Sequence, residues 1–219
     1  MELNALEQQC LNLMVDRGVA DAALQLSSLS EESVSLSVSH LHLSPISQVL
    51  SLLRLGNVPV ACIAQDVSQV LSGRLMLMLH ADQCLALINA LIGKVPTLSE
   101  AAEGVVQHEA LTEIGNIIIS AVVGALDDGL NLQTVLGAPE YSEQKLVELF
   151  EHSLQHISEG ADSQPANTPA VTLGAGAVHV LVMSLAMVAA RCQVTMTLAL
   201  MLTPVAVATL RMHLKGGTA

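Results

Sequence analysis

An internal repeat of about 100 residues is the feature that most constrains this chain. Residues 11–26 align with residues 111–126 at an offset of 100. Leucines near the ends of the two copies match at an offset of 123: Leu79, Leu87 and Leu91 with Leu202, Leu210 and Leu214. Each copy has the same order of patterns, namely helix, strand, helix, strand, strand, helix. The 219 residues are therefore predicted to form a single domain with two pseudo-repeats, about 1–94 and about 97–219.

Two such repeats predict an α+β fold. Strand pairs from two like units would most simply join in one central sheet, with both long helices packed on it. The second repeat is longer, and its added residues fit a longer helix and a polar loop between 140 and 170. Hydrophobic residues make up 52% of the chain, so a sizeable core is expected, built from aliphatic side chains because aromatic residues are only 1%.

Periodicity and breaking residues predict the individual elements. Helices are expected at 3–27, 45–53, 81–92, from 97 to the stop at 127–129, from a cap at 142 to about 157, and 204–214. Strands are expected at 33–43, 58–66, 70–80, 131–138, 172–190 and 193–202. A linker is predicted at 94–97 and a polar, mobile loop at 158–169.

The second long helix carries a line of polar residues on an otherwise apolar surface. At about 100° per residue, one narrow stripe holds Glu109, Glu113, Asn116 and Ser120. Such a stripe is either the solvated face of an amphipathic helix or a functional site.

The first repeat serves as an internal control for these two readings. There Glu113, Asn116 and Ser120 correspond to Leu13, Asp16 and Ala20. A one-residue slip of the alignment does not restore the Glu and Asn pair either. The stripe is therefore dispensable for the fold in one copy, which leaves both readings open.

Charge and composition exclude some classes of function. The net charge of -12, with 8 basic against 20 acidic residues, argues against nucleic-acid binding, which requires a basic footprint. The four scattered cysteines are typical of reduced thiols in a cytosolic protein, and the start of the chain lacks a signal-peptide pattern. A cytoplasmic location is expected.

Three further patterns are better explained by structure than by function. The uncharged run 170–190 is long enough to span a bilayer, but the alternation that follows it favours a buried strand hairpin. His40 and His42 lie on one face of a strand without a third ligand nearby in sequence, so a structural pair is favoured over zinc. The glycine-containing segment 174–178 lacks phosphate-loop spacing. No metal or cofactor of its own is expected for this chain.

Glu113-Ile-Gly-Asn116, followed by 22 residues and then Pro139, resembles the Glu-x-x-Asn-x22-Pro signature of CheC, CheX and FliY. These are chemotaxis phosphatases that act on the phospho-aspartate of the CheY receiver. Glu109 loosely fits the acidic residue or Ser that the family pattern has four positions before the Glu. The resemblance also covers the duplicated order, residues 71–75, and a length close to that of a stand-alone CheC.

The resemblance implies a CheC-like fold and a catalytic pair. By analogy, Glu113 would pair with the lysine of the receiver's active site and Asn116 would orient the attacking water. Mg²⁺ would come from the receiver partner. Glu109, Ser120 and Pro139 would be supporting residues. Because Leu13 and Asp16 depart from the signature, catalysis is expected from the second repeat alone.

A second hypothesis is a non-catalytic interaction module. FliM has a related middle domain without the catalytic pair, and CheC proteins can dock the deamidase CheD. A CheD-like partner is therefore the alternative to a phosphorylated CheY-like receiver.

Overall fold

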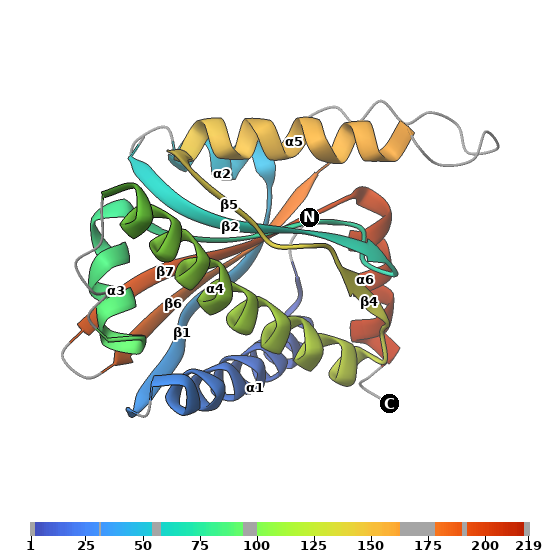
Figure 1. Cartoon of the computed structure of the whole chain (residues 1–219). Coiled ribbons are helices and arrows are strands. Elements are labelled where there is room, and N and C mark those ends of the chain that lie inside the picture. Colours follow the sequence, from blue (N-terminus) through green and yellow to red (C-terminus); the bar gives the residue numbers. More distant parts are fainter. Residues whose placement is uncertain are drawn as a thin grey trace.

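The computed structural model describes residues 3–30, 32–53, 58–93, 100–162, 178–189 and 192–216. Over these ranges a seven-stranded antiparallel sheet lies between two layers of helices (Figure 1). The elements follow in chain order: α1 (Ala5–Ser30), β1 (Val34–Pro45), α2 (Ile46–Leu53), β2 (Pro59–Gln69), β3 (Gly73–His80), a 3-10 turn (Ala81–Gln83), α3 (Cys84–Leu91), α4 (Glu100–Leu130), β4 (Thr134–Leu136), β5 (Glu140–Lys145), α5 (Leu146–Asp162), β6 (His179–Ala189), β7 (Cys192–Leu202) and α6 (Pro204–Gly216). The predicted α+β class with one shared sheet is confirmed.

The strand order is symmetric about the centre of the sheet. It runs β1-β6-β7-β3-β2, and the outer edge of β2 pairs with β4 and then with β5. In the repeats, β1 corresponds to β4 and β5, β2 to β6, and β3 to β7. Exchanging each strand for its counterpart gives the same order read from the opposite edge of the sheet. This arrangement is what two repeats sharing a sheet would produce, while their origin by duplication stays a prediction.

The two faces of the sheet bury separate apolar cores. The larger core lies under α1, α3, α4 and α6, and from α4 it takes Leu111, Ile114, Ile118 and Val122. The smaller core lies under α2 and α5, with Phe150 as its largest side chain. Alternation along the strands feeds both cores, since successive side chains point to opposite faces.

The two long helices cross in direct backbone contact. A Cβ built on Gly18 of α1 would lie 2.7 Å from Val122 Cα and 2.8 Å from the Ala121 carbonyl oxygen of α4. A side chain at this position would separate the helices. The predicted pairing of the long helices on one face of the sheet therefore depends on a glycine at their crossing.

The predicted boundaries fail mainly between 127 and 162. Helix α4 continues through the expected stop to Leu130 and ends where Asn131 takes a left-handed φ of 52°. The predicted strand 131–138 is only β4, and the expected helix start at Ser142 lies inside a strand, β5. That strand is polar, and among the described strands it pairs with β2 alone, so its sequence has no apolar alternation that would predict a strand.

The remaining differences are smaller. The turn between β2 and β3 lies at 70–72, after the expected position. Helix α5 extends to Asp162 and takes in the first part of the predicted loop. The predicted linker at 94–97, the rest of the loop and the start of the strand at 172 lie outside the described residues.

The apolar run before residue 190 ends as β6, which forms a hairpin with β7 inside the sheet, as predicted. Within the described residues, one helical stretch, Gly104–Leu130, is long and apolar enough to cross a membrane by length and composition. It belongs to α4, 56% of its most apolar window is buried in the fold, and core helices of soluble proteins meet the same criterion.

Candidate functional site

The predicted polar stripe lies on the outward face of α4. Glu109, Glu113 and Ser120 are exposed, and Asn116 is half-buried. The opposite side of the same helix is buried in the larger core. The structure therefore brings all four residues of the stripe onto one solvent-accessible face, with Asn116 nearest to the sheet.

A close approach between α4 and β2 places Asn116 beside the sheet. A Cβ built on Gly115 would lie 2.8 Å from Ile63 Cβ, so only a glycine allows the helix to pack this closely at that point. A glycine inside a helix costs about 1 kcal/mol of helix stability. Here the glycine also allows the close packing that brings the next residue, Asn116, to the sheet.

Asn116 is held from below by a residue that the sequence analysis missed. The Gln65 carboxamide of β2 donates from Nε2 to Asn116 Oδ1 at 2.9 Å. Ser120, one turn further along α4, donates to the same oxygen in a longer contact of 3.4 Å. Ser120 therefore lies in hydrogen-bonding contact with Asn116.

Gln65 left a signal in the sequence, although a weak one. The β2 residues Ala61, Ile63 and Val67 share one face of the strand and are buried in the larger core. Gln65 lies between Ile63 and Val67 in this row and is 1% exposed. The sequence therefore predicts that Gln65 shares a strand face with apolar residues, but it does not predict the contact with α4.

Pro139 lies at an interruption of the sheet next to Gln65. Strand β2 pairs Ala64 with Glu140 of β5 and Val67 with Leu136 of β4. Three residues, 137–139, thus face two residues, 65–66, which is the count of a β-bulge. Pro139 lacks an N–H, so it suits a position outside the ladder. The proline of the signature is thereby adjacent to the strand segment that contacts Asn116.

Near the N-terminal end of the stripe, α4 rests against β5. The rings of His108 and Tyr141 stack with centroids 4.2 Å apart and planes at 26°. Burial, with smaller effects from Cys84 and Glu143, raises the pKa of the Tyr141 phenol to about 12. Tyr141 is therefore a neutral packing residue beside the stripe.

The equivalent surface of α1 has a different character. Leu13 is 64% exposed, and Asp16 and Ala20 are exposed as well. The sheet position matched to Gln65 is Met183 of β6, because Gln65 pairs with Leu75 and Met183 pairs with Leu198, 123 residues later. Met183 is fully buried. The outward face of α1 thus lacks the stripe, and the sheet position matched to Gln65 lacks the buried amide.

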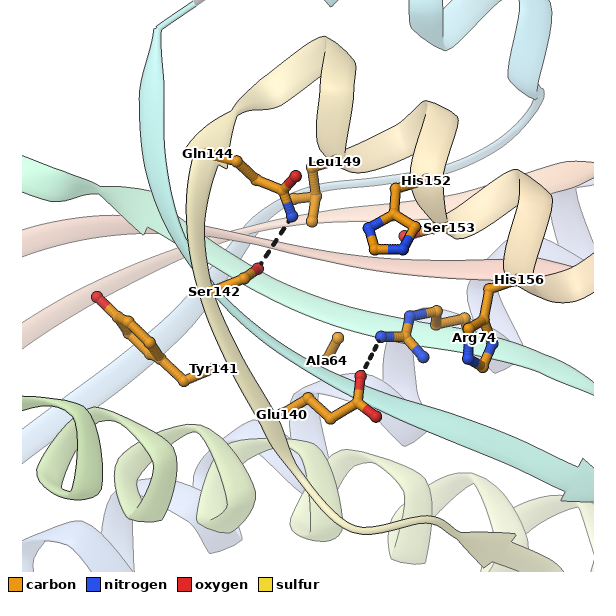
Figure 2. A pocket seen from close by; sticks show the side chains of 10 residues that line it. All are labelled: Ala64, Arg74, Glu140, Tyr141, Ser142, Gln144, Leu149, His152, Ser153 and His156. Atoms are coloured by element: carbon orange, nitrogen blue, oxygen red, sulfur yellow. Dashed lines mark hydrogen bonds and ion pairs between the residues drawn. The ribbon is translucent and has the colours of Figure 1, made fainter.

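A hollow of about 430 Å³ lies on the opposite face of the sheet, between β5 and α5 (Figure 2). Its charged centre is Arg74, which is 8% exposed and bonded to Asp66 at 2.7 Å and Glu140 at 2.6 Å. Burial lowers the pKa of Arg74, but the hydrogen bonds to these two carboxylates outweigh it and the net pKa is raised. Since two acids neutralise this cation, the cluster ties β3 to β2 and β5.

Other predicted features play no part in the stripe. His40 and His42 are exposed on β1, where a register shift separates Val38 from His40. Among the described residues, no group of three or more His, Cys, Asp and Glu side chains could hold a metal ion. All four cysteines are free, and burial raises the pKa of Cys62 to about 12.

No protein-family model matches this chain. Among solved structures, FliY of Thermotoga maritima is similar over 99% of this chain and 100% of its own, with a TM-score of 0.68 at 16% identity. FliM in a FliM-SpeE complex from H. pylori covers 99% of this chain and 98% of its own, with a TM-score of 0.63 at 10% identity. The FliM middle domain from H. pylori covers 97% and 99%, with a TM-score of 0.59 at 13% identity.

The chain has the fold of FliY and of the FliM middle domain. The resemblance inferred from the signature is therefore confirmed at the level of the fold. Sequence identities of 10–16% establish a shared fold but not a shared chemistry. The chemistry has to be inferred from the residues of the stripe.

Proposed function

We propose that this protein is a chemotaxis-related phosphatase that hydrolyses the phospho-aspartate of a CheY-like receiver. One observation carries the proposal: the exposed Glu113 and the half-buried Asn116 lie one turn apart on one face of α4, with the Asn116 carboxamide held by hydrogen bonds. They belong to a signature, ending at Pro139, that resembles the phosphatase members of this fold.

Glu113 is suited to docking. Its carboxylate is exposed and, within the described residues, no ion pair occupies it. In the proposed complex it pairs with the lysine of the receiver's active site, and this contact sets the stripe over the acyl phosphate. The ionic contact forms in a site that the two proteins close to water, where it is stronger than at a free surface.

Asn116 is suited to holding the attacking water. Phosphoryl transfer is catalysed mainly by positioning and by charge stabilisation, so a neutral carboxamide in a fixed place is sufficient. The water held by Asn116 attacks phosphorus in line, the bond to the aspartyl oxygen breaks, and inorganic phosphate leaves. Mg²⁺ bound by the receiver would neutralise charge on the phosphoryl oxygens.

The experiment measures the lifetime of a phosphorylated CheY-type receiver, loaded by acetyl phosphate with Mg²⁺, with and without this protein. We expect accelerated decay that is lost in Glu113→Ala and in Asn116→Ala, with rate losses of at least about 100-fold. Asp16→Ala, at the matched position of α1, is the control and should keep full activity. Wild-type protein that leaves the lifetime unchanged would overturn the proposal.

The alternative function is a non-catalytic interaction module. The likeness to FliM middle domains favours it, because that fold is also found in complexes with other proteins, as in the FliM-SpeE structure. In this case the protein would bind a flagellar-switch component or a CheD-like deamidase. Stable binding of such a partner, with no change in the lifetime of the phosphorylated receiver, would favour this function over the phosphatase.

A further inference from the structure

Gln65 is out of place for a core residue. It is 1% exposed, its neighbours on the same face of β2 are apolar, and its Oε1 is buried without a hydrogen-bond partner. Burying an unpaired amide oxygen costs free energy that an apolar side chain of similar size would not. A residue that weakens the core in this way calls for a compensating role.

The described interaction of the Gln65 side chain is its hydrogen bond to Asn116. Nε2 donates to Asn116 Oδ1 at 2.9 Å, and the Ser120 hydroxyl approaches the same oxygen at 3.4 Å. With both donors on Oδ1, this oxygen is turned toward the protein. The Asn116 amide nitrogen is the end left for a ligand at the surface.

The local backbone favours this contact. Gly115 lets α4 approach Ile63, two residues before Gln65 on the same face of β2. On the other side, the bulge at 137–139 lies opposite Gln65, and bulges beside sites commonly re-aim a side chain. The Gly137 N–H donates to the Asp66 carbonyl at 2.8 Å and holds the bulge in place.

The matched position in the other half supports a role tied to the site. Where α1 has Leu13 and Asp16 in place of the signature residues, the sheet has the fully buried Met183 in place of a glutamine. The fold thus accepts an apolar residue at this place in the sheet. Of the two matched positions, the one beneath Asn116 is the one with an amide.

We infer that Gln65 is a positioning residue, which holds the Asn116 carboxamide with Oδ1 inward and the amide nitrogen toward the docked receiver. This inference rests on the proposed phosphatase function and adds a residue that the signature does not contain. Gln65 does not touch the substrate. It acts by removing the rotational freedom of Asn116 before the receiver binds.

The test is Gln65→Met, which copies the residue at the matched position. We expect kcat for receiver dephosphorylation to fall about 10- to 100-fold, with KM changed less than about twofold because Glu113 still docks the receiver. The urea midpoint should stay the same or rise, since an unpaired buried amide is removed. Met183→Leu is the matched control and should leave kcat unchanged.

Two further measurements separate positioning from a structural role. In an Asn116→Ala background, Gln65→Met should cause no additional loss of kcat, because the two residues act as one unit. In NMR spectra, the Asn116 side-chain amide resonances should move toward values of a freely rotating amide in Gln65→Met.

The outcomes are distinct. If wild type is active and kcat is unchanged in Gln65→Met, the inference is overturned. It is also overturned if the decrease in kcat equals the fraction of Gln65→Met protein that is unfolded. A wild type that leaves receiver lifetime unchanged overturns the proposed function instead. In that case unmoved Asn116 amide resonances would still overturn the positioning role, and shifted resonances would support it.

Discussion

The two long helices of this protein share one scaffold but differ on their outward faces. Both pack on the same side of the sheet, and they cross in contact at Gly18 and Val122. On α4 the outward face carries Glu113 and Asn116, while the matched places on α1 carry Leu13 and Asp16. The buried faces of both helices contribute mainly aliphatic side chains to the larger core. A site of this kind can therefore be present or absent without a change of fold.

The difference extends one layer inward. Beneath Asn116 the sheet has Gln65, and at the matched place in the other half it has Met183. The first half keeps its polar interior contact elsewhere, at Glu7 near the start of α1, which bonds Arg211 of α6 at 3.2 Å. The buried Glu7 thus holds α1 to α6, while the buried Gln65 contacts the candidate site on α4.

The largest expected effect comes from the crossing that joins the two regions. In Gly18→Ala the new Cβ would meet the backbone of Val122 and Ala121, which cannot turn aside as a side chain can. We expect a loss of about 3 kcal/mol in the free energy of unfolding, measured by urea denaturation.

Gly124→Ala is the control, because a Cβ at Gly124 has no neighbour within 4 Å. It should raise stability by about 0.5–1 kcal/mol through helix preference alone. Equal stability changes in the two variants would show that the close crossing of α1 and α4 is not a constraint.

The next effect tests the inner layer of the comparison. Met183→Gln buries an amide among the apolar side chains of the larger core, at the sheet position matched to Gln65, so we expect a loss of about 2 kcal/mol in urea denaturation. Met183→Leu keeps the position apolar and is the control, which should lose less than about 1 kcal/mol. An unchanged urea midpoint in Met183→Gln would show that a buried amide needs no partner at this position.

Much of this fold could be predicted from the sequence because its signals are local. Alternation in β1 and β7, the apolar runs of β2 and β3, and the long apolar helices are readable residue by residue. Strand β5 was missed because Glu140–Lys145 is polar and lies at the sheet edge, where burial imposes no pattern. The end of α4 was placed early because Gly129 packs against Met14 inside the helix and does not end it.

The candidate site was predictable only in part, for a similar reason. Glu113 and Asn116 lie on one helix, so their spacing places them on one face. Gln65 is 51 residues from Asn116, and their contact depends on how α4 sits on β2. Register and packing of this kind are set by the whole core. The glutamine in an apolar row marks an irregularity without naming its partner.

The smallest effect concerns the two carboxylates that distinguish the halves. Glu7 is 2% exposed and accepts a hydrogen bond from the Asn4 backbone N–H at 2.9 Å. This bond, helped by Arg211 and opposed by burial, lowers the pKa of the Glu7 carboxyl. Glu113 is exposed, and its proposed partner belongs to another protein. One carboxylate should therefore matter for stability and the other for activity.

We expect Glu7→Gln to lower the free energy of unfolding by about 1 kcal/mol at neutral pH. Because the pKa of folded Glu7 is depressed, the wild-type advantage is fully present above the unfolded pKa of about 4.3 and is lost as the pH falls through the lower folded value. Urea denaturation from pH 7 to pH 3 measures this change. Glu113→Gln is the control for loss of a carboxylate, and it should keep wild-type stability at pH 7 while losing receiver dephosphorylation. A stability gap for Glu7→Gln that persists undiminished at pH 3 would mean that the charge of Glu7 does not hold α1 to α6.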